Sequence, residues 1–385
     1  MREILDYIPL PEGGAALARV YGDSPVLALP EALPGPEGGA LPLVKLGGYC
    51  FAETVRDQPR GPLLRCVREE GGALRPIAPE QAPQEDLHPA AGRFLEEVAL
   101  PAALREVGNC AFYNCRALRR ITAGGGPLAM GSDVFLNCFD LAEVVLYASP
   151  DAATGLPAIV NNLAGNLRAV FRPEGPEGAV CAAFRYPEYW EDIEETPAHI
   201  LLHTFSGQGY HYRQCFRDGR LLPGEYDAVF AQGHGGDDPI YMALLCLDRL
   251  RYPWQLEEGA AGLYRAFLAR QGSAAAECLI RAQDREGLKA LLGLGVMDSS
   301  ALAAASRAAQ RAGDAQAAAL LADAEYQAQA AAPRRRRRYD FDFCPHRERR
   351  RSPWRGKRPL TSTRPFSRRG PRPRRNGRPG WAARC

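Results

Sequence analysis

Four residues in the middle of the chain, His199, His203, His211 and Cys215, have side chains and spacings that suit a metal ion. His199 and His203 form one pair, and His211 and Cys215 form another, each with an i,i+4 spacing. On a helix this spacing places both side chains of a pair on one face. Imidazole and thiolate groups in a tetrahedral set are typical zinc ligands. One hypothesis is therefore a zinc-binding module, or a zinc-dependent hydrolase, built around these residues.

Two other interpretations of the same residues stay open. The segment 205–210 contains two glycines and predicts a turn between extended segments rather than helices. On a strand, residues four apart share a face but lie about 13 Å from each other, which is too far for one metal ion. The histidines would then be ordinary packing residues. A nucleophilic pair of Cys215 and His211 is conceivable by residue type, but no orienting acid or oxyanion motif accompanies it.

Other signals of catalysis are weak. The segment 126–132 has glycines at P-loop spacing but lacks the lysine that would reach a phosphate. Neither Gly-x-Ser-x-Gly nor His-Glu-x-x-His occurs in the sequence. We therefore expect a protein without enzymatic activity and without a required cofactor, zinc being the one candidate.

The strongest pattern is an internal repeat. Residues 111–118 (AFYNCRAL) recur at 134–141 (VFLNCFDL), an offset of 23 residues, and 41–51 (LPLVKLGGYCF) is a partial third copy. A unit this short cannot bury its own apolar side, whereas stacked copies can, with one short strand per unit forming a parallel sheet. The inward positions would be Leu100, Leu104, Val107, Phe112, Cys115, Leu118, Ile121, Phe135, Cys138, Leu141 and Val144.

Small and polar residues also repeat within these copies. Gly108 and Gly131 stand where a tight turn needs a positive φ or a close approach of the backbone. We expect Asn114 and Asn137 to bond to the backbone of the loop. The outward residues Arg105, Arg119, Arg120 and Glu143 are the candidates for contact with a partner protein.

The repeat resembles the BspA-like leucine-rich repeat family, whose units read approximately Leu-Pro, a spacer, Val-x-x-Ile-Gly and Ala-Phe-x-x-Cys-x-x-Leu. The match is close over 97–146 and looser over 41–54. The resemblance implies a curved solenoid that binds other proteins, often in surface proteins. A long Pro/Gly-rich insertion at 56–92 departs from the family pattern.

The segments after the repeat differ in character. Residues 160–171 read as an irregular cap that ends in a strand, and 187–195 as an acidic surface segment or a short helix. From Asp238, a good N-cap before Pro239, the apolar period becomes helical, with helices expected near 239–252, 263–268, 274–282, 284–293, 299–312 and 314–329. Segments 283–292 and 313–321 are alike at an offset of 30, so 277–326 shows a weak ankyrin-like resemblance beside the plainer interpretation of generic helical hairpins.

The net charge of +3 conceals a strong division along the chain. Residues 333–385 contain 20 Lys and Arg but 3 Asp and Glu, a net +17, while the remainder has 28 basic and 42 acidic residues, a net −14. The tail begins with five arginines, Arg334, Arg335, Arg336, Arg337 and Arg338, and lacks apolar periodicity, so we expect a disordered segment that binds nucleic acid or another polyanion. The abrupt change in composition also allows that the native chain ends near Phe343 and that the rest is a shifted reading frame.

Two further observations bear on location. No apolar run approaches the length that crosses a bilayer, and the N-terminus lacks the apolar region of a signal peptide. Eleven cysteines in such a chain are best interpreted as reduced and mostly buried. We therefore expect a cytoplasmic protein.

Together these patterns predict an α+β protein with four parts. They are a short leucine-rich-repeat solenoid over 1–146, an irregular α/β cap or linking segment over 147–237, an α-helical, repeat-like domain over 238–330 and a disordered basic tail over 331–385. The expected function is that of a non-enzymatic scaffold with an unidentified protein partner; the alternative is polyanion binding through the tail.

Overall fold

The computed structural model describes residues 2–56, 61–69, 71–81, 87–196, 199–233 and 235–331, and within 193–203 the backbone alone. One compact unit comprises Met1–Glu325; the second, Tyr326–Cys385, is described as far as Ala331, where the last helix ends. No helix in these described ranges is long and apolar enough to cross a membrane.

The chain begins with an antiparallel hairpin, β1 (Glu3–Pro9) and β2 (Ala15–Gly22), within a nine-stranded sheet. β6 (Leu64–Arg68) pairs with β1, and β7 (Leu74–Ile77) pairs with β6, both antiparallel. Part of the segment 56–92, expected as an insertion into the repeat, therefore forms strands of this sheet. Two short strands, β4 (Ala32–Pro34) and β8 (His88–Pro89), extend the sheet beside β5 (Ala40–Leu46) and β2.

Buried ion pairs explain why this hairpin accepts strand β6. Asp6 and Glu3 on β1 lie directly opposite Arg65 and Arg68 on β6, at N···O distances of 2.5 Å and 3.0 Å. Both carboxylates are buried, so they need cationic or hydrogen-bonding partners to avoid a large desolvation cost. The charges therefore select the partner strand and its register.

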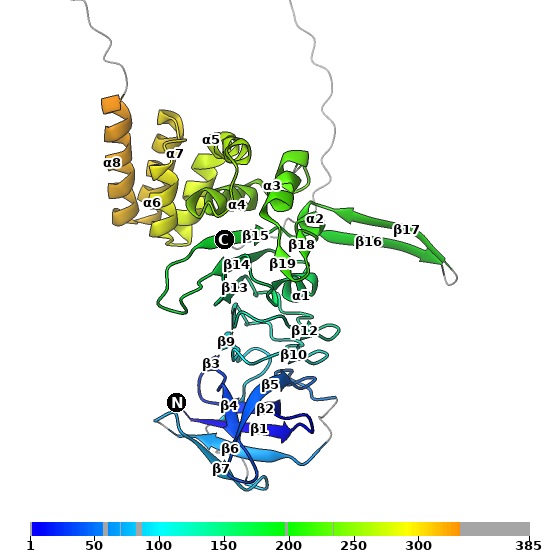
Figure 1. Cartoon of the computed structure of the whole chain (residues 1–385). Coiled ribbons are helices and arrows are strands. Elements are labelled where there is room, and N and C mark those ends of the chain that lie inside the picture. The colour runs from blue at the N-terminus through cyan, green and yellow to red at the C-terminus, as the bar shows by residue number, and fades with distance from the viewer. Residues whose placement is uncertain are drawn as a thin grey trace, which may run out of the picture. The chain divides into compact units, whose positions relative to one another are not determined.

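A β-solenoid follows, in which each turn adds one short strand to a parallel sheet (Figure 1). In spatial order its parallel strands are β3 (Val26–Ala28), β9 (Glu97–Ala99), β11 (Arg120–Ala123), β13 (Glu143–Leu146) and β14 (Leu167–Phe171). β15 (Ala182–Tyr186) closes the row in the antiparallel sense. A second parallel row, within the N-terminal sheet, consists of β5 (Ala40–Leu46), β10 (Glu106–Val107) and β12 (Ala129–Met130).

The 23-residue repeat corresponds to one solenoid turn. Ile121 pairs with Val98 on one side and with Val144 on the other, each 23 residues away. The partial first copy stacks directly on the next one, because β5 pairs with β10 and the Phe51 ring stacks on Phe112 at 4.9 Å between centroids. The expected solenoid is therefore present and includes the copy at 41–51.

The inward positions expected from the repeat form the core. All of them are 8% exposed or less: Leu100, Leu104, Val107, Phe112, Cys115, Leu118, Ile121, Phe135, Cys138, Leu141 and Val144. Burial of each of the larger apolar side chains stabilises the folded chain by roughly 1.5–3 kcal/mol. Stacking of the turns thus supplies the apolar burial that a single unit lacks.

Identical side chains form ladders through the stacked turns. Phe112 stacks on Phe135 at 5.4 Å between centroids, continuing the contact with Phe51. The thiols of Cys115 and Cys138 donate to the carbonyls of Phe51 and Phe112, with S···O distances of 3.1 Å and 3.0 Å. Each cysteine thus satisfies a carbonyl of the preceding turn, and burial raises the pKa of the Cys115 thiol to about 12.

The paired asparagines differ from the expectation. Asn114 and Asn137 adopt left-handed conformations, with φ of 64° and 66°, and the Asn137 amide donates to the Asn114 carbonyl oxygen at 2.7 Å. They bond to each other, not to the loop backbone as expected. Asparagine tolerates positive φ better than other residues with a side chain, which explains its place in both turns.

The repeated glycines are required by close approach. A Cβ atom at Gly131 would lie 2.6 Å from the Asn109 backbone nitrogen of the preceding turn, and one at Gly108 would lie 2.6 Å from the Gly48 nitrogen. Neither glycine has a positive φ, so close approach of the backbone, and not a left-handed conformation, explains both glycines.

We expect Gly131→Ala to destabilise the protein by about 2 kcal/mol, because the added methyl group must displace backbone of the adjacent turn. Gly126→Ala is the matched control, since a Cβ there meets nothing within 4 Å. Urea denaturation followed by circular dichroism measures both free energies of unfolding. Equal stabilities for the two variants would contradict the close approach.

The segment after the repeat is a mixed α/β region. Helix α1 (Leu156–Asn161) precedes β14, which agrees with the expected cap that ends in a strand. Residues 187–195 were expected as a surface segment or short helix, but β16 (Trp190–Thr196) and β17 (His199–Ser206) form an antiparallel hairpin there. Helix α2 (Gly209–Tyr212), the strands β18 (Phe216–Arg217) and β19 (Arg220–Leu221), and helix α3 (Pro223–Gln232) complete the region.

Helices form the rest of the described chain (Figure 1). They are α4 (Pro239–Arg251), α5 (Glu258–Arg281), α6 (Arg285–Gly293), α7 (Ser299–Ala312) and α8 (Ala315–Ala331). The Asp238 carboxylate accepts from the Ile240 amide at 2.8 Å, which confirms it as the N-cap of α4. The two helices expected near 263–268 and 274–282 are one continuous helix, because Gly272 and Ser273 between them do not interrupt the hydrogen bonding.

The offset of 30 residues marks a repeated helix–helix connection. Gln283 and Gly313 both have positive φ, and Asp284 and Asp314 follow as N-caps of α6 and α8. The amide of each aspartate also bonds to a carbonyl five residues earlier, Leu279 and Ala309, as in a Schellman motif. The similarity of segments 283–292 and 313–321 therefore reflects the same turn between two helices. The ankyrin-like resemblance stays a prediction.

Candidate interaction surface

A row of alternating charges crosses the parallel sheet of the solenoid. Glu97, Arg120, Glu143 and Arg168 lie at directly paired positions of β9, β11, β13 and β14. Successive N···O distances are 3.3 Å, 2.8 Å and 2.9 Å. Opposite charges directly across neighbouring strands stabilise a sheet and fix its register.

These contacts change the interpretation of the residues expected to bind a partner. Arg120 and Glu143 are already paired with each other, and Arg119 forms an exposed ion pair with Glu96 at 3.6 Å. Arg105 is exposed in the loop before β10, and no ion pair of it occurs within the described ranges. The structure does not gather the four residues into one site, although all lie on the solenoid.

The inner end of the charge row is buried beneath α4. Asp248 accepts hydrogen bonds from Arg168 on β14 and from Arg185 on β15, at 2.7–3.0 Å. Burial disfavours the ionised carboxylate, but the two guanidinium groups outweigh that effect and hold the pKa of Asp248 below its usual value. This ionised aspartate joins the last two strands of the sheet to the first long helix.

The next residue of α4 forms a second buried pair on a different side. Arg249 is 0% exposed and donates two hydrogen bonds, of 2.9 Å and 2.8 Å, to Asp227 on α3. Tyr264 on α5 donates to the same carboxylate at 2.7 Å, and the Arg249 guanidinium lies 4.6 Å from the Phe184 ring centroid on β15. Adjacent residues of α4 therefore bind the sheet and the neighbouring helices.

We expect Asp248→Asn to destabilise the protein at pH 7 by about 3–5 kcal/mol, because two arginines would lose their buried counter-charge. Asp140→Asn, at an exposed position, is the control. The pKa of Asp248 is lower in the folded chain than in the unfolded chain. The carboxylate therefore contributes its full stabilising free energy above about pH 4, and this contribution is lost as the pH falls through the pKa of the folded state.

Urea denaturation at a series of pH values would measure this effect. The difference in unfolding free energy between the wild-type protein and Asp248→Asn should shrink below about pH 4. A difference that stays constant from pH 7 down to pH 2 would contradict an ionised Asp248.

A groove of about 850 Å³ lies beside the second parallel row. It lies between the β1–β2 hairpin and the turns that carry β5, β10 and β12. Its lining residues are Ile8, Leu10, Ala16, Lys45, Gly47, Gly48, Tyr49, Arg56, Glu106, Val107, Gly108, Asn109, Ala129, Met130 and Gly131. We call this surface the three-turn groove.

The three-turn groove combines charged and apolar side chains. Lys45 and Glu106 are paired at 2.6 Å across β5 and β10, yet they are 33% and 48% exposed. An exposed pair of this kind contributes little to stability, so its charges remain available to a ligand. The backbone N–H groups of Gly108 and Gly131 donate to the Leu46 and Val107 carbonyls of the preceding turn, at 2.9 Å and 2.8 Å.

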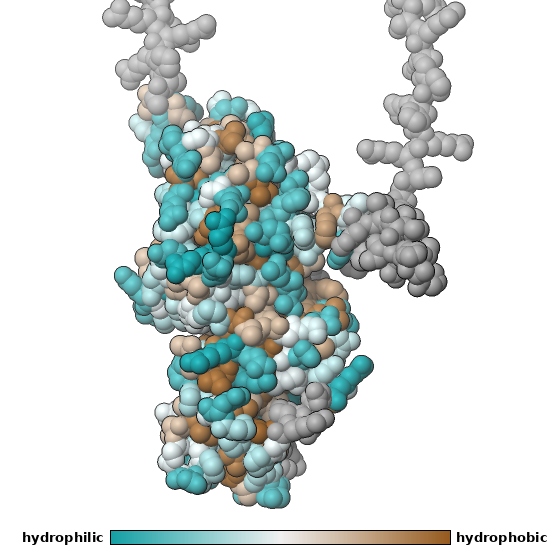
Figure 2. All heavy atoms as spheres, turned by 45° about the vertical axis from the view of Figure 1, so that its right-hand side comes forward, coloured by the Kyte–Doolittle hydropathy of each residue, from teal (hydrophilic) through white to brown (hydrophobic). Residues whose placement is uncertain are grey.

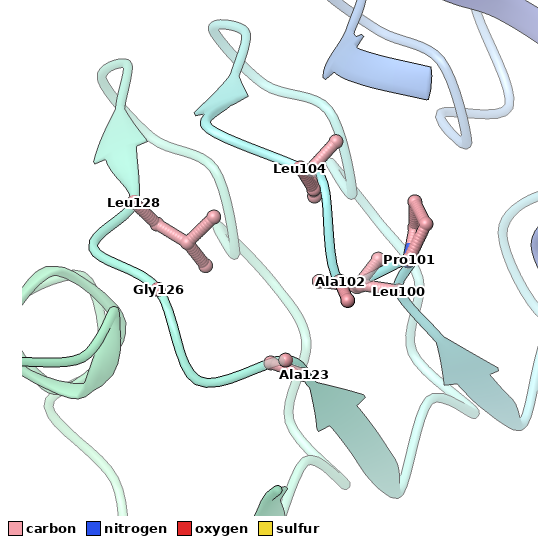
Figure 3. A pocket seen from close by; sticks show the side chains of 8 residues that line it. Leu100, Pro101, Ala102, Leu104, Ala123, Gly126 and Leu128 are labelled. Carbon is pink, nitrogen blue, oxygen red and sulfur yellow. The ribbon is translucent and has the colours of Figure 1, made fainter. Parts of the chain in front are cut away.

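Apolar residues on one face of the molecule are dispersed. On the face drawn in Figure 2 hydrophobic residues lie in small groups separated by hydrophilic ones. A second depression, lined by Leu100, Pro101, Ala102, Leu104, Ala123, Gly124, Gly126 and Leu128, has no room for water. Figure 3 shows Leu128 and Leu104 pointing into the space between adjacent turns, so this depression is part of the solenoid interior.

The histidine and cysteine cluster is only partly described. His199 and His203 lie on strand β17, but their side chains are outside the described residues. His211 is exposed on the short helix α2, so the second pair is not in an extended segment as the turn had suggested. Cys215 is 3% exposed, its thiol donates to the backbone carbonyl of His211, and burial raises its pKa to about 12.

Other thiols and carboxylates give no alternative centre. Among the described side chains, no group of three or more His, Cys, Asp and Glu residues is arranged to hold a metal ion. The described cysteines are free thiols, and most are buried, in agreement with the sequence: Cys50, Cys66, Cys110, Cys115, Cys138, Cys181, Cys215, Cys246 and Cys278. The arginines Arg334 to Arg338 lie outside the described residues.

Sequence reasoning missed the three-turn groove and the buried pairs of α4. The only indication of Lys45 and Glu106 in the sequence is their position: each stands two residues before a glycine of the repeat, and the two residues are 61 positions apart. Asp248 and Arg249 are a charged pair inside an otherwise apolar helix, a pattern that indicates buried partners.

No family model, curated protein or solved structure has a significant match to this chain.

Proposed function

We propose that this chain is a non-enzymatic scaffold that holds an extended segment of a protein partner in the three-turn groove. The observation that carries the proposal is the groove itself, which spans three stacked turns and is about 850 Å³ in volume. Ligand sites typically have volumes of about 300–1,000 Å³ and combine apolar walls with a few polar groups. The proposed repeat type, BspA-like, is supported by the 23-residue turn and its Phe, Cys and Asn ladders.

The chemistry of the groove favours a peptide over a small apolar molecule. Lys45, Arg56 and Glu106 provide charges of both signs, and Ile8, Leu10 and Met130 provide apolar contacts. The N–H groups of Gly108 and Gly131 already bond to the Leu46 and Val107 carbonyls, so the groove would hold a peptide through its charged and apolar side chains. This location replaces the residues expected from the sequence, Arg105, Arg119, Arg120 and Glu143, because the structure does not gather them into one site.

We expect Ala129→Trp to weaken binding of groove ligands at least tenfold, because Ala129 is exposed in the groove and an indole would occupy the space. Peptides selected from a random display library on the full chain would be titrated by fluorescence anisotropy. Ala142→Trp is the matched control, at an exposed alanine that does not line the groove. Equal affinities for both variants would contradict the groove as the binding surface.

The alternative function, polyanion binding through the tail, is favoured by the net charge of +17 over residues 333–385. If Arg334 to Arg338 contact phosphates, the affinity for a DNA duplex should fall roughly 500-fold between 50 and 200 mM salt. Replacing the five arginines with glutamine should flatten this dependence, whereas lysine at the same positions should preserve it. Filter binding across the salt series provides the measurement.

A further inference from the structure

One stacked position of the solenoid holds two arginines and a phenylalanine. In the parallel sheet Glu97, Arg120 and Glu143 pair directly, and four residues before each of them stand Arg93, Arg116 and Phe139. The backbone between these positions is also joined, because the Arg119 amide donates to the Glu96 carbonyl at 2.7 Å. Neighbouring turns of such a sheet lie about 4.8 Å apart. We call Arg93, Arg116 and Phe139 the arginine ladder.

The two arginines of the ladder have no counter-charge from the solenoid. Where charged residues stack between the turns of β9 and β11 at positions 96 and 119, or 97 and 120, an acid lies opposite an arginine. Arg93 and Arg116 are instead neighbours of like charge, which repel each other. Both are exposed, and no ion pair of either occurs in the part of the chain that the structure describes. The pair therefore favours an anion from outside the chain.

The third member of the ladder adds an apolar contact. Phe139 is 74% exposed, and Leu136 in the same turn is 47% exposed. Arginine and aromatic side chains are both enriched in surfaces that bind other proteins. An exposed ring next to two guanidinium groups suits a peptide in which an anionic residue is followed by an apolar one.

Carboxylates at both ends of the ladder limit the size of the anion. Glu53 packs against Gly92, the residue before Arg93, and the exposed Asp140 follows Phe139. A nucleic-acid strand carries a charge at every phosphate and would be repelled at both ends. A single compact anion placed between the two arginines avoids both carboxylates.

A phosphate group matches two adjacent arginines better than a carboxylate does. A phosphorylated side chain carries about two negative charges and three acceptor oxygens, so one group can bond to both guanidinium groups. Guanidinium forks bind phosphate through paired hydrogen bonds. A carboxylate has one charge and two oxygens, and would leave one arginine unneutralised.

We propose that the arginine ladder binds a phosphorylated side chain of a partner protein, with an apolar residue of the same segment on Phe139. The ladder shares no residue with the three-turn groove, so this site does not depend on the function proposed for the groove. A partner held in this way would bind only after its own phosphorylation.

The test is a titration of the full chain with short fluorescent peptides, followed by anisotropy. The peptides come from a degenerate library with a central phosphoserine, selected on the same chain. We expect Arg93→Gln/Arg116→Gln to weaken binding about tenfold or more, because charge-assisted hydrogen bonds are lost. Removing the phosphate, or replacing phosphoserine with glutamate, should weaken binding by a similar factor, and Phe139→Ala should weaken it less.

A matched control separates the ladder from other basic residues of the chain. Arg265→Gln/Arg307→Gln removes the same charge at exposed helix positions and should leave the affinity unchanged. Residues 333–385 are present in both double variants, so binding through them alone would give equal affinities and overturn the proposal. Equal binding of the glutamate peptide, or competition by single-stranded DNA that disappears in Arg93→Gln/Arg116→Gln, would also overturn it. Circular dichroism verifies that the variants fold.

Discussion

Two adjacent buried charges on α4, Asp248 and Arg249, determine how the sheet and the helices of this protein join. Asp248 neutralises Arg168 and Arg185 of the last two strands, while Arg249 is neutralised by Asp227 of α3. A buried charge is tolerated only where its partner and its hydrogen bonds are in place. The helix can therefore occupy only a position that satisfies both pairs, and this constraint sets the end of the solenoid.

Both ends of the solenoid are covered by elements that ion pairs hold in place. A stack of turns exposes a final apolar layer and unpaired strand edges, and both must be covered. At the first turn the β1–β2 hairpin provides cover, and its own carboxylates are matched by Arg65 and Arg68 of β6. At the last turn β15 and α4 provide it through Arg185 and Asp248. Ion pairs supply register at both ends, and apolar stacking supplies the burial between them.

The surfaces proposed for binding follow from this construction. The three-turn groove lies where glycines let adjacent turns approach closely, beside the exposed pair of Lys45 and Glu106. Because the N–H groups of Gly108 and Gly131 are bonded between turns, the groove presents its charged and apolar side chains.

The repeating part of this protein could be predicted from its sequence alone. The 23-residue offset, the inward apolar set and the cap at Asp238 are local, periodic signals, because neighbouring turns and helix starts impose the same demand at each recurrence. Three contacts could not be predicted from the sequence: the pairing of 64–68 with β1, the ion pair of Arg120 with Glu143, and the binding of two arginines by Asp248. These contacts join residues far apart in the chain, where the partner of a charge depends on the packing that brings it near.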